Sequence, residues 1–185
     1  MSSIATEPSR TVIALACLIA LASCILVIGP STPARAAEVD ATCIGTQHTT
    51  FSPGLTLTPR DVTLTVNTIY TPCKSLSVPA LTSATQTSSF VVPNASCLNP
   101  FDPGSGTKII EWNTGQTSTF SFNRIGTNVG GSTIVTEIGL ITEGLFAGDN
   151  AVEVVTGPTL DSLECLSQTG ITDRFNILKL EITSP

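Results

Sequence analysis

The sequence predicts an all-β fold, an antiparallel β-sandwich of the immunoglobulin-like type with one short helix near residues 159–167. Apolar residues alternate with Thr or Ser along several stretches, which is the pattern of strands buried on one face. Gly, Pro and Asn interrupt these stretches at intervals of roughly ten residues, as turns do in a sandwich. Threonine is abundant, and its branched side chain suits a pleated strand surface.

The clearest predicted strand spans residues 62–70, where Val62, Leu64 and Val66 share one face and polar residues share the other. The same alternation recurs in residues 119–123, 134–141, 152–154 and 177–182. Residues 42–51 form a further predicted strand. The predicted turns between these stretches include Pro72, Asn113-Thr114-Gly115, Gly130-Gly131, Gly148-Asp149-Asn150 and Gly157-Pro158.

The predicted helix follows Pro158. Leucines recur every third residue, at Leu160, Leu163 and Leu166, which keeps them near one face over two turns. Cys165 lies in this segment, so a disulfide could hold the short helix against one end of the sandwich.

Residues 1–36 have the features of a secretory signal peptide, and residues 37–185 form a single predicted domain. A polar start with Arg10 is followed by an uncharged apolar stretch, Thr11–Ile28, and then by Gly29 and Pro30. Ala34-Arg35-Ala36 supplies the small-x-small pattern at which signal peptidase cleaves, after Ala36 or after Ala37. We therefore expect a secreted, extracellular protein.

Two alternatives to free release remain open. The apolar stretch is long enough to span a bilayer if it is not cleaved, which would make it a signal anchor. Leu21-Ala22-Ser23-Cys24 fits a bacterial lipobox, in which Cys24 would carry a lipid. The residues after Cys24 are apolar, whereas mature lipoproteins usually become polar there, so the sequence favours a protein without a membrane anchor after cleavage.

The charge of the domain argues against some partners. The whole chain has 8 basic and 14 acidic residues, and residues 1–36 hold Arg10, Arg35 and Glu7. Residues 37–185 therefore keep 6 basic and 13 acidic residues, a net charge of −7. Phosphate groups are bound by clustered Lys and Arg, and the six bases are scattered along the chain. We expect no nucleic-acid partner and no anionic membrane partner.

Four cysteines remain after the leader, Cys43, Cys73, Cys97 and Cys165, which predicts two disulfides. If residues 42–51 and 62–70 pair as antiparallel strands about residue 58, Cys43 lies opposite Cys73. This predicts a Cys43–Cys73 bridge and, by elimination, a Cys97–Cys165 bridge. No C-x-x-C motif occurs and His48 is the single histidine, so we expect no metal and no other cofactor.

Four segments are similar to small secreted proteins of actinobacteria that have no assigned activity. They are residues 51–56 (FSPGLT), 110–118 (IEWNTGQTS), 143–149 (EGLFAGD) and 158–163 (PTLDSL). The resemblance spans most of the domain and implies a secreted bacterial β protein. It supplies no functional residues.

No catalytic residue can be assigned from the sequence. His48 is the single imidazole, and its polar strand setting predicts a solvent-facing side chain. A glycosidase would need paired carboxylates, usually with aromatic platforms, and the chain has one Trp and one Tyr. The candidate carboxylates are Glu111, Glu137, Glu143, Asp149, Glu153, Asp161 and Glu164.

Two further features have a structural and a functional interpretation. Trp112 is predicted to be a core residue packed near a disulfide, and the alternative is an exposed contact aromatic. Residues 144–150 could be a calcium-binding loop or a tight connection between two strands. They lack the alternating acidic ligands of a calcium loop, so we predict a connection.

These observations predict a non-enzymatic secreted protein that binds a protein or cell-envelope partner, or has a structural role outside the cell. A hydrolytic enzyme is one alternative, and it requires a pocket that holds at least two of the candidate carboxylates. A secreted inhibitor or toxin is the other, and its contact loop would be residues 94–106, braced by Cys97.

Overall fold

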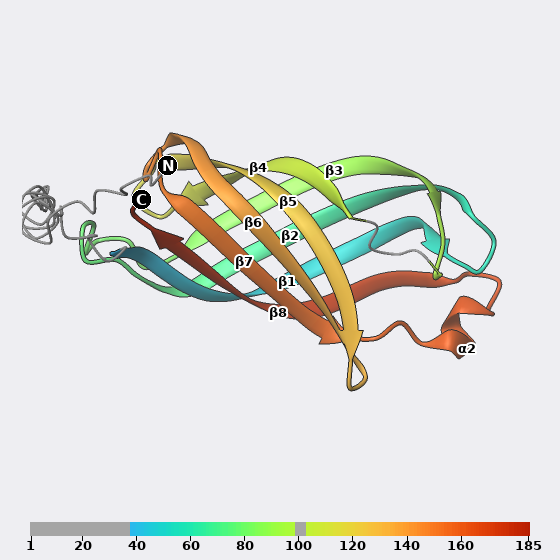
Figure 1. Ribbon diagram of the computed structural model, residues 1–185. Helices are drawn as coiled ribbons and strands as arrows, with labels where there is room; N and C mark the ends of the chain where they lie inside the picture. The colour runs from blue at the N-terminus through green and yellow to red at the C-terminus, as the bar shows by residue number, and fades with distance from the viewer. Residues whose placement is uncertain (1–37, 99–102) are drawn as a thin grey trace, which may run out of the picture. The chain divides into compact units, whose positions relative to one another are not determined.

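Eight antiparallel strands and one short helix make up most of residues 38–98 and 103–185, the residues that the computed structural model describes (Figure 1). The expected leader, residues 1–36, with its cleavage site and Cys24, lies outside the described residues. The elements are β1 (Val39–Leu55), β2 (Arg60–Lys74), β3 (Ala84–Ala95), β4 (Gly104–Trp112), β5 (Thr117–Val129), β6 (Ser132–Gly144), β7 (Asn150–Pro158), α2 (Ser162–Cys165) and β8 (Ile171–Thr183).

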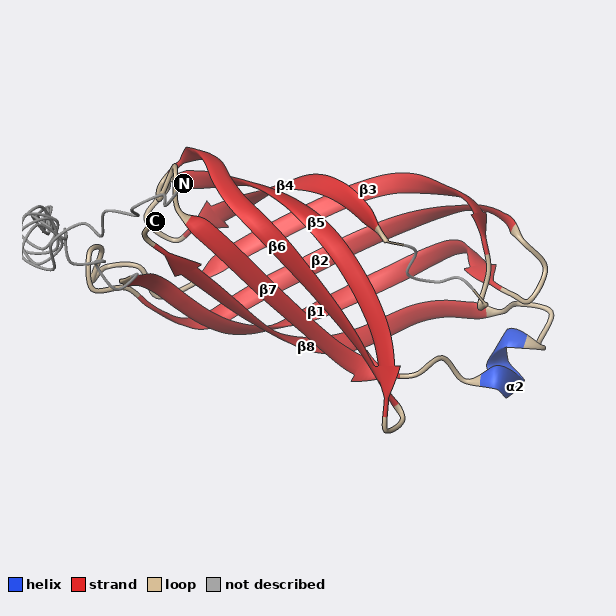
Figure 2. Cartoon of the chain, viewed as in Figure 1, coloured by secondary structure: helices blue, strands red, loops and turns tan. Residues whose placement is uncertain are grey.

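The strands close into a barrel, so the predicted immunoglobulin-like sandwich is wrong. Each strand pairs with the next along the chain, and β8 returns to pair with β1 along most of its length. Figure 2 shows the strands wrapping around one interior. A strand of a sandwich and a strand of a barrel both bury one face, so alternation predicts the class and the antiparallel order but not the closure.

The strands are longer than the turn signals suggested. Pro72, a predicted turn residue, lies inside β2 and follows a cis peptide bond. Across from it, β1 contains a bulge between Cys43 and Gly45. A Cβ atom at Gly45 would lie 2.3 Å from the Ile69 carbonyl oxygen, so glycine is required for this close approach. The bulge in β1 therefore lets its pairing with β2 continue past a proline that would otherwise end the strand.

Two apolar clusters fill the ends of the barrel. The larger, here the terminal core, lies where β1 begins and β8 ends, and includes Tyr70, Trp112, Phe120, Leu180 and Ile182. The smaller, here the helix-side core, lies near α2 and includes Phe51, Leu55, Val62, Cys165 and Ile171. Between them, polar and apolar side chains both face the interior.

The two predicted disulfides are present, Cys43–Cys73 and Cys97–Cys165, with Cα–Cα distances of 4.1 and 6.2 Å. The first joins directly opposed residues of β1 and β2. The second joins the end of α2 to the segment after β3. Because disulfides persist in oxidising compartments, they indicate such an environment for this domain.

The helix lies within the predicted range but is shorter. Asp161 caps it by accepting a hydrogen bond of 2.8 Å from the Leu163 backbone amide. Within the described ranges, the structure has no helix with the length and apolarity needed to cross a membrane.

Candidate ligand-binding cavity

A cavity of about 460 Å³ lies inside the barrel between the two cores. All eight strands contribute to its wall. Its apolar lining comes from Phe51, Leu64, Val66, Phe90 and Phe122. Its polar lining comes from amide, hydroxyl and charged side chains, chiefly Gln47, Thr49, Gln86, Ser88, Lys108, Arg124, Thr133, Glu137, Arg174 and Asn176. This mixed lining can hold a molecule that has both an apolar and a polar part.

The barrel wall is weakest between β3 and β4. These strands pair only at Ala84–Trp112 and Thr85–Glu111, whereas every other neighbouring pair is matched over a much longer register. Beyond this short seam, Ser88 and Phe90 of β3 and Thr107 of β4 line the cavity. Among the described residues, no backbone ladder joins β3 to β4 beyond this short seam.

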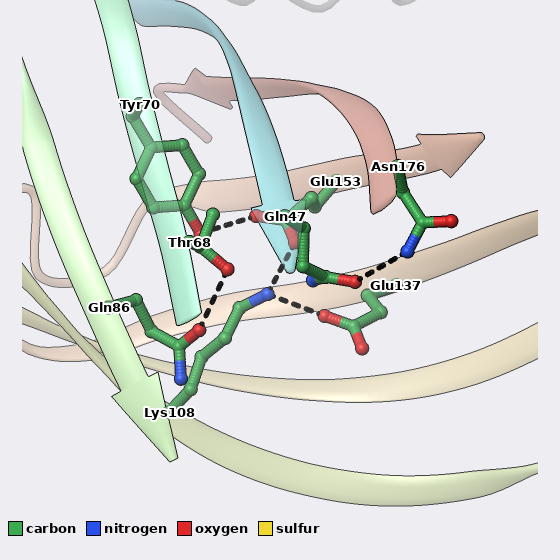
Figure 3. Close-up of polar contacts among 8 residues, drawn as sticks. All are labelled: Gln47, Thr68, Tyr70, Gln86, Lys108, Glu137, Glu153 and Asn176. Atoms are coloured by element: carbon green, nitrogen blue, oxygen red, sulfur yellow. Dashed lines mark hydrogen bonds and ion pairs between the residues drawn. The ribbon is translucent and has the colours of Figure 1, made fainter. Parts of the chain in front are cut away.

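A buried ionic network forms the cavity wall next to the terminal core (Figure 3). The Lys108 Nζ atom lies 2.6 Å from Glu137 Oε2 and 2.6 Å from Glu153 Oε1. The Tyr70 hydroxyl donates a hydrogen bond of 2.7 Å to Glu153 Oε2. Glu153 and Tyr70 are fully buried, while Lys108 and Glu137 reach the cavity. The ammonium also lies 5.3 Å from the Phe122 ring centroid, within reach of a cation–π contact.

The network raises the pKa values of Lys108 and Tyr70. Burial alone would lower the Lys108 pKa, but the carboxylates of Glu153 and Glu137 outweigh it and raise the pKa above its ordinary value. Burial, followed by the negative charge of Glu153, raises the pKa of Tyr70 well above its ordinary value. Lys108 is therefore a cation and Tyr70 a neutral donor at physiological pH.

Two further hydrogen-bonded pairs hold lining amides in place, as Figure 3 shows. Thr68 donates from Oγ1 to Gln86 Oε1 at 3.1 Å, and Asn176 donates from Nδ2 to Gln47 Oε1 at 3.4 Å. Each pair joins neighbouring strands, β2 with β3 and β8 with β1. These contacts orient the amides on the wall before any ligand is present.

Two arginines also face the cavity. Arg174 is buried, and its Nη2 donates to the Pro158 carbonyl oxygen. Burial lowers the pKa of Arg174 from its ordinary value. Arg124 is half-buried, and among the described residues its Nε atom is inaccessible to solvent and has no hydrogen-bond partner.

The predicted site residues have different positions in the barrel. His48 lies on the outer wall, stacked on Phe175 with ring centroids 4.1 Å apart, and 3.7 Å from Asp173. Trp112 is a core residue, as predicted: it is 3% exposed, lies in the same cluster as Cys43 and Cys73, and donates from Nε1 to Ser118 Oγ at 2.8 Å.

Two of the seven candidate carboxylates come together, Glu137 in the cavity lining and Glu153 behind it. The other five do not line the cavity. Residues 144–150 connect β6 to β7, as predicted.

The predicted inhibitor loop, residues 94–106, is shorter in the structure. Asn94 and Ala95 belong to the end of β3, and Gly104–Gly106 belong to the start of β4. Residues 99–102 lie outside the described residues. Cys97 is disulfide-bonded to Cys165, so the bridge anchors the segment after β3 to α2.

Sequence reasoning missed Lys108 and Arg124, although the sequence contains a signal for both. Lys108 is in phase with Ile110 and Trp112, and Arg124 is in phase with Phe120 and Phe122. A charged residue at a core-facing position needs a buried partner or a ligand, so this phase relation would have marked an interior site.

Comparison of the chain with protein-family models, with curated proteins and with solved structures finds no match.

Proposed function

We propose that this protein is a small-molecule-binding barrel that holds one ligand in its interior, and that the ligand enters where β3 and β4 are not paired. The cavity of about 460 Å³ is the observation that carries the proposal. Eight-stranded barrels either fill their interior with side chains or hold one small ligand, and ligand pockets commonly span roughly 300–1,000 Å³. Here both ends are packed and the middle is hollow, which favours the second case.

Binding is favoured over hydrolysis by the arrangement of the two interior carboxylates. Glu137 and Glu153 both contact the same Lys108 ammonium at 2.6 Å. A glycosidase needs its two carboxylates on opposite sides of the scissile bond. Two carboxylates on one cation instead form a fixed wall, and Glu137 presents part of that wall to the ligand.

We further propose that the protein is secreted and acts outside the cell. The two disulfides support an oxidising compartment, and the sequence of residues 1–36 predicts export. A protein or envelope partner stays a prediction. A secreted binding barrel could deliver its ligand to such a partner.

The test uses N-phenyl-1-naphthylamine, a neutral dye whose fluorescence rises in apolar surroundings. We expect saturable binding with one dye per protein. Ser88→Trp places an indole in the cavity, because Ser88 lines it, and should weaken binding at least about tenfold by occupying the space. Thr87→Trp is the matched control, because Thr87 directly precedes Ser88 in β3 and is exposed.

Equal loss of dye binding in both Trp variants, or no loss in either, would overturn the proposal, provided that circular dichroism shows both to be folded. Absence of saturable binding by the unaltered protein would overturn it as well.

A further inference from the structure

We infer that the ligand of this cavity is an amphipathic oxyanion whose negative group pairs with Arg124. This inference rests on the proposed binding function and specifies the chemistry of the ligand. Two observations support the inference. Charge is distributed unevenly between the inside and the outside of the barrel, and Arg124 lacks a partner among the described residues.

Positive charge is concentrated inside the barrel. Residues 37–185 contain six basic and thirteen acidic residues, and three of the six bases line the cavity: Lys108, Arg124 and Arg174. Glu137 is the acidic residue of the lining, and Glu153 lies directly behind it. The three cations outnumber these two carboxylates, although the domain as a whole is acidic. The interior therefore suits a ligand with one negative charge.

Arg124 is the cation of this lining that has no partner among the described residues. Lys108 is bound by two carboxylates, and Arg174 donates to a backbone carbonyl. Arg124 has no ion pair or hydrogen bond to any described residue, and its Nε is shielded from solvent. Shielding a cationic donor without an acceptor is costly, so a bound anion would supply what the empty cavity lacks.

The position of Glu137 explains why Arg124 is unpaired. Arg124 of β5 lies directly opposite Glu137 of β6 in the strand register, so an ion pair between them would be expected. Glu137 instead contacts Lys108, at 2.6 Å. Because Glu137 is paired with Lys108, the Arg124 guanidinium is available to a ligand.

The apolar part of the ligand has a matching surface beside Arg124. Phe122 is two residues before Arg124 on the same face of β5 and lines the cavity. Gly106 faces the Phe122 ring from β4, where an added Cβ would lie 2.8 Å from the ring, so no side chain covers it from there. Leu64, Val66 and Phe90 complete an apolar lining. A guanidinium can bind an oxyanion through two parallel hydrogen bonds, which selects carboxylates and sulfonates over neutral groups.

The test compares two dyes that share one skeleton. 1-Anilinonaphthalene-8-sulfonate carries an anionic group, and N-phenyl-1-naphthylamine lacks it. Both are titrated into the unaltered protein, Arg124→Gln, Arg124→Lys and Lys74→Gln. Lys74 is an exposed base outside the cavity, so Lys74→Gln matches the loss of one positive charge.

We expect the sulfonate dye to bind the unaltered protein about tenfold more tightly than the neutral dye, the size of one charge-assisted hydrogen-bond set. Arg124→Gln should remove this preference and leave the affinity for the neutral dye within about twofold. Arg124→Lys should retain part of it, and Lys74→Gln should retain all of it. The melting temperature of Arg124→Gln should be unchanged or higher, because a cation whose shielded Nε lacks an acceptor is removed.

The possible failures are distinguishable. If neither dye binds the unaltered protein, the proposed binding function fails. If both dyes bind with equal affinity, or if Lys74→Gln lowers sulfonate binding as much as Arg124→Gln, the binding function stands and the role of Arg124 is wrong. If Arg124→Gln lowers the melting temperature and weakens both dyes alike, Arg124 is a structural residue, which also contradicts the inference.

Discussion

At the scale of single residues, Lys108 of β4 ties together Glu137 of β6 and Glu153 of β7. It is 9% exposed and contacts both Glu137 and Glu153, which would repel each other without it. A buried ion pair does not by itself raise stability over an apolar replacement, but the loss of one partner leaves buried charge unpaired. We therefore expect the free energy of unfolding to fall strongly when any one residue of the network is replaced.

Lys108→Met should lower the free energy of unfolding by about 3–5 kcal/mol, because two carboxylates would then share a buried site without a cation. Urea unfolding, followed by the fluorescence of Trp112, measures this change. The double variant Lys108→Met, Glu153→Gln should recover part of the loss, since only one charge remains. A loss below about 1 kcal/mol for Lys108→Met would show that the pair is hydrated and not buried.

Tyr70 and Lys108 make the barrel sensitive to alkali. Both have a raised pKa in the folded protein, so the unfolded chain loses these protons first as pH rises, near pH 10.0 and 10.5. Above about pH 10 the unfolded state binds fewer protons than the native state, and the free energy of unfolding falls with increasing pH. Their contribution is fully present below pH 10.

The chain has one tyrosine, so tyrosinate absorbance reports Tyr70 alone. We expect its midpoint in the native protein to lie above the midpoint in denaturant. Tyr70→Phe should lower stability at neutral pH by about 1–3 kcal/mol, because Glu153 loses a donor, and should reduce the fall in stability between pH 9 and 11. Native and denatured midpoints that coincide would contradict the burial of this hydroxyl.

At the scale of elements, the strands and the Cys43–Cys73 disulfide could be predicted because both depend on local patterns, and Cys97–Cys165 then followed by elimination. The alternation of Val62, Leu64 and Val66 identified the inward face of β2, and the antiparallel pairing of β1 with β2 led to the Cys43–Cys73 bridge. Alternation did not reveal where charge is buried. In β7, Glu153 points inward while Val152 and Val154 point outward. Glu153 can be buried because Lys108 of β4 supplies a positive charge beside it.

The two disulfides should have different local effects. Cys97–Cys165 spans 68 residues and Cys43–Cys73 spans 30. On the chain-entropy relation, removal of either bridge should lower the free energy of unfolding by about 4 kcal/mol. Only Cys97→Ala with Cys165→Ala should also expose the amides of α2 to hydrogen exchange, because four helical residues are too few to be stable alone. Dye binding should persist in this variant.

Hydrogen exchange with mass analysis checks this prediction. Unchanged protection of residues 162–166 in the Cys97→Ala, Cys165→Ala variant would contradict an anchoring role of the bridge. The Cys43→Ala, Cys73→Ala variant is the control, since its bridge lies in the terminal core, away from α2.

At the scale of the whole molecule, closure of the sheet creates the candidate site. It depends on pairing β1 with β8, whose residues are separated by most of the domain, and no local pattern in the sequence encodes that contact. The cavity could not be predicted for the same reason: it exists because inward-facing residues of all eight strands meet between two apolar cores.

The most direct test of a ligand-binding barrel is a crystal structure of the purified protein grown with 1-anilinonaphthalene-8-sulfonate. We expect eight strands closed by the β1–β8 pair, with the dye inside, its rings against Phe122 and its sulfonate within hydrogen-bond distance of Arg124. Two separate sheets, or a closed barrel with the dye bound only to the outer wall and the cavity filled by side chains, would contradict the proposed function.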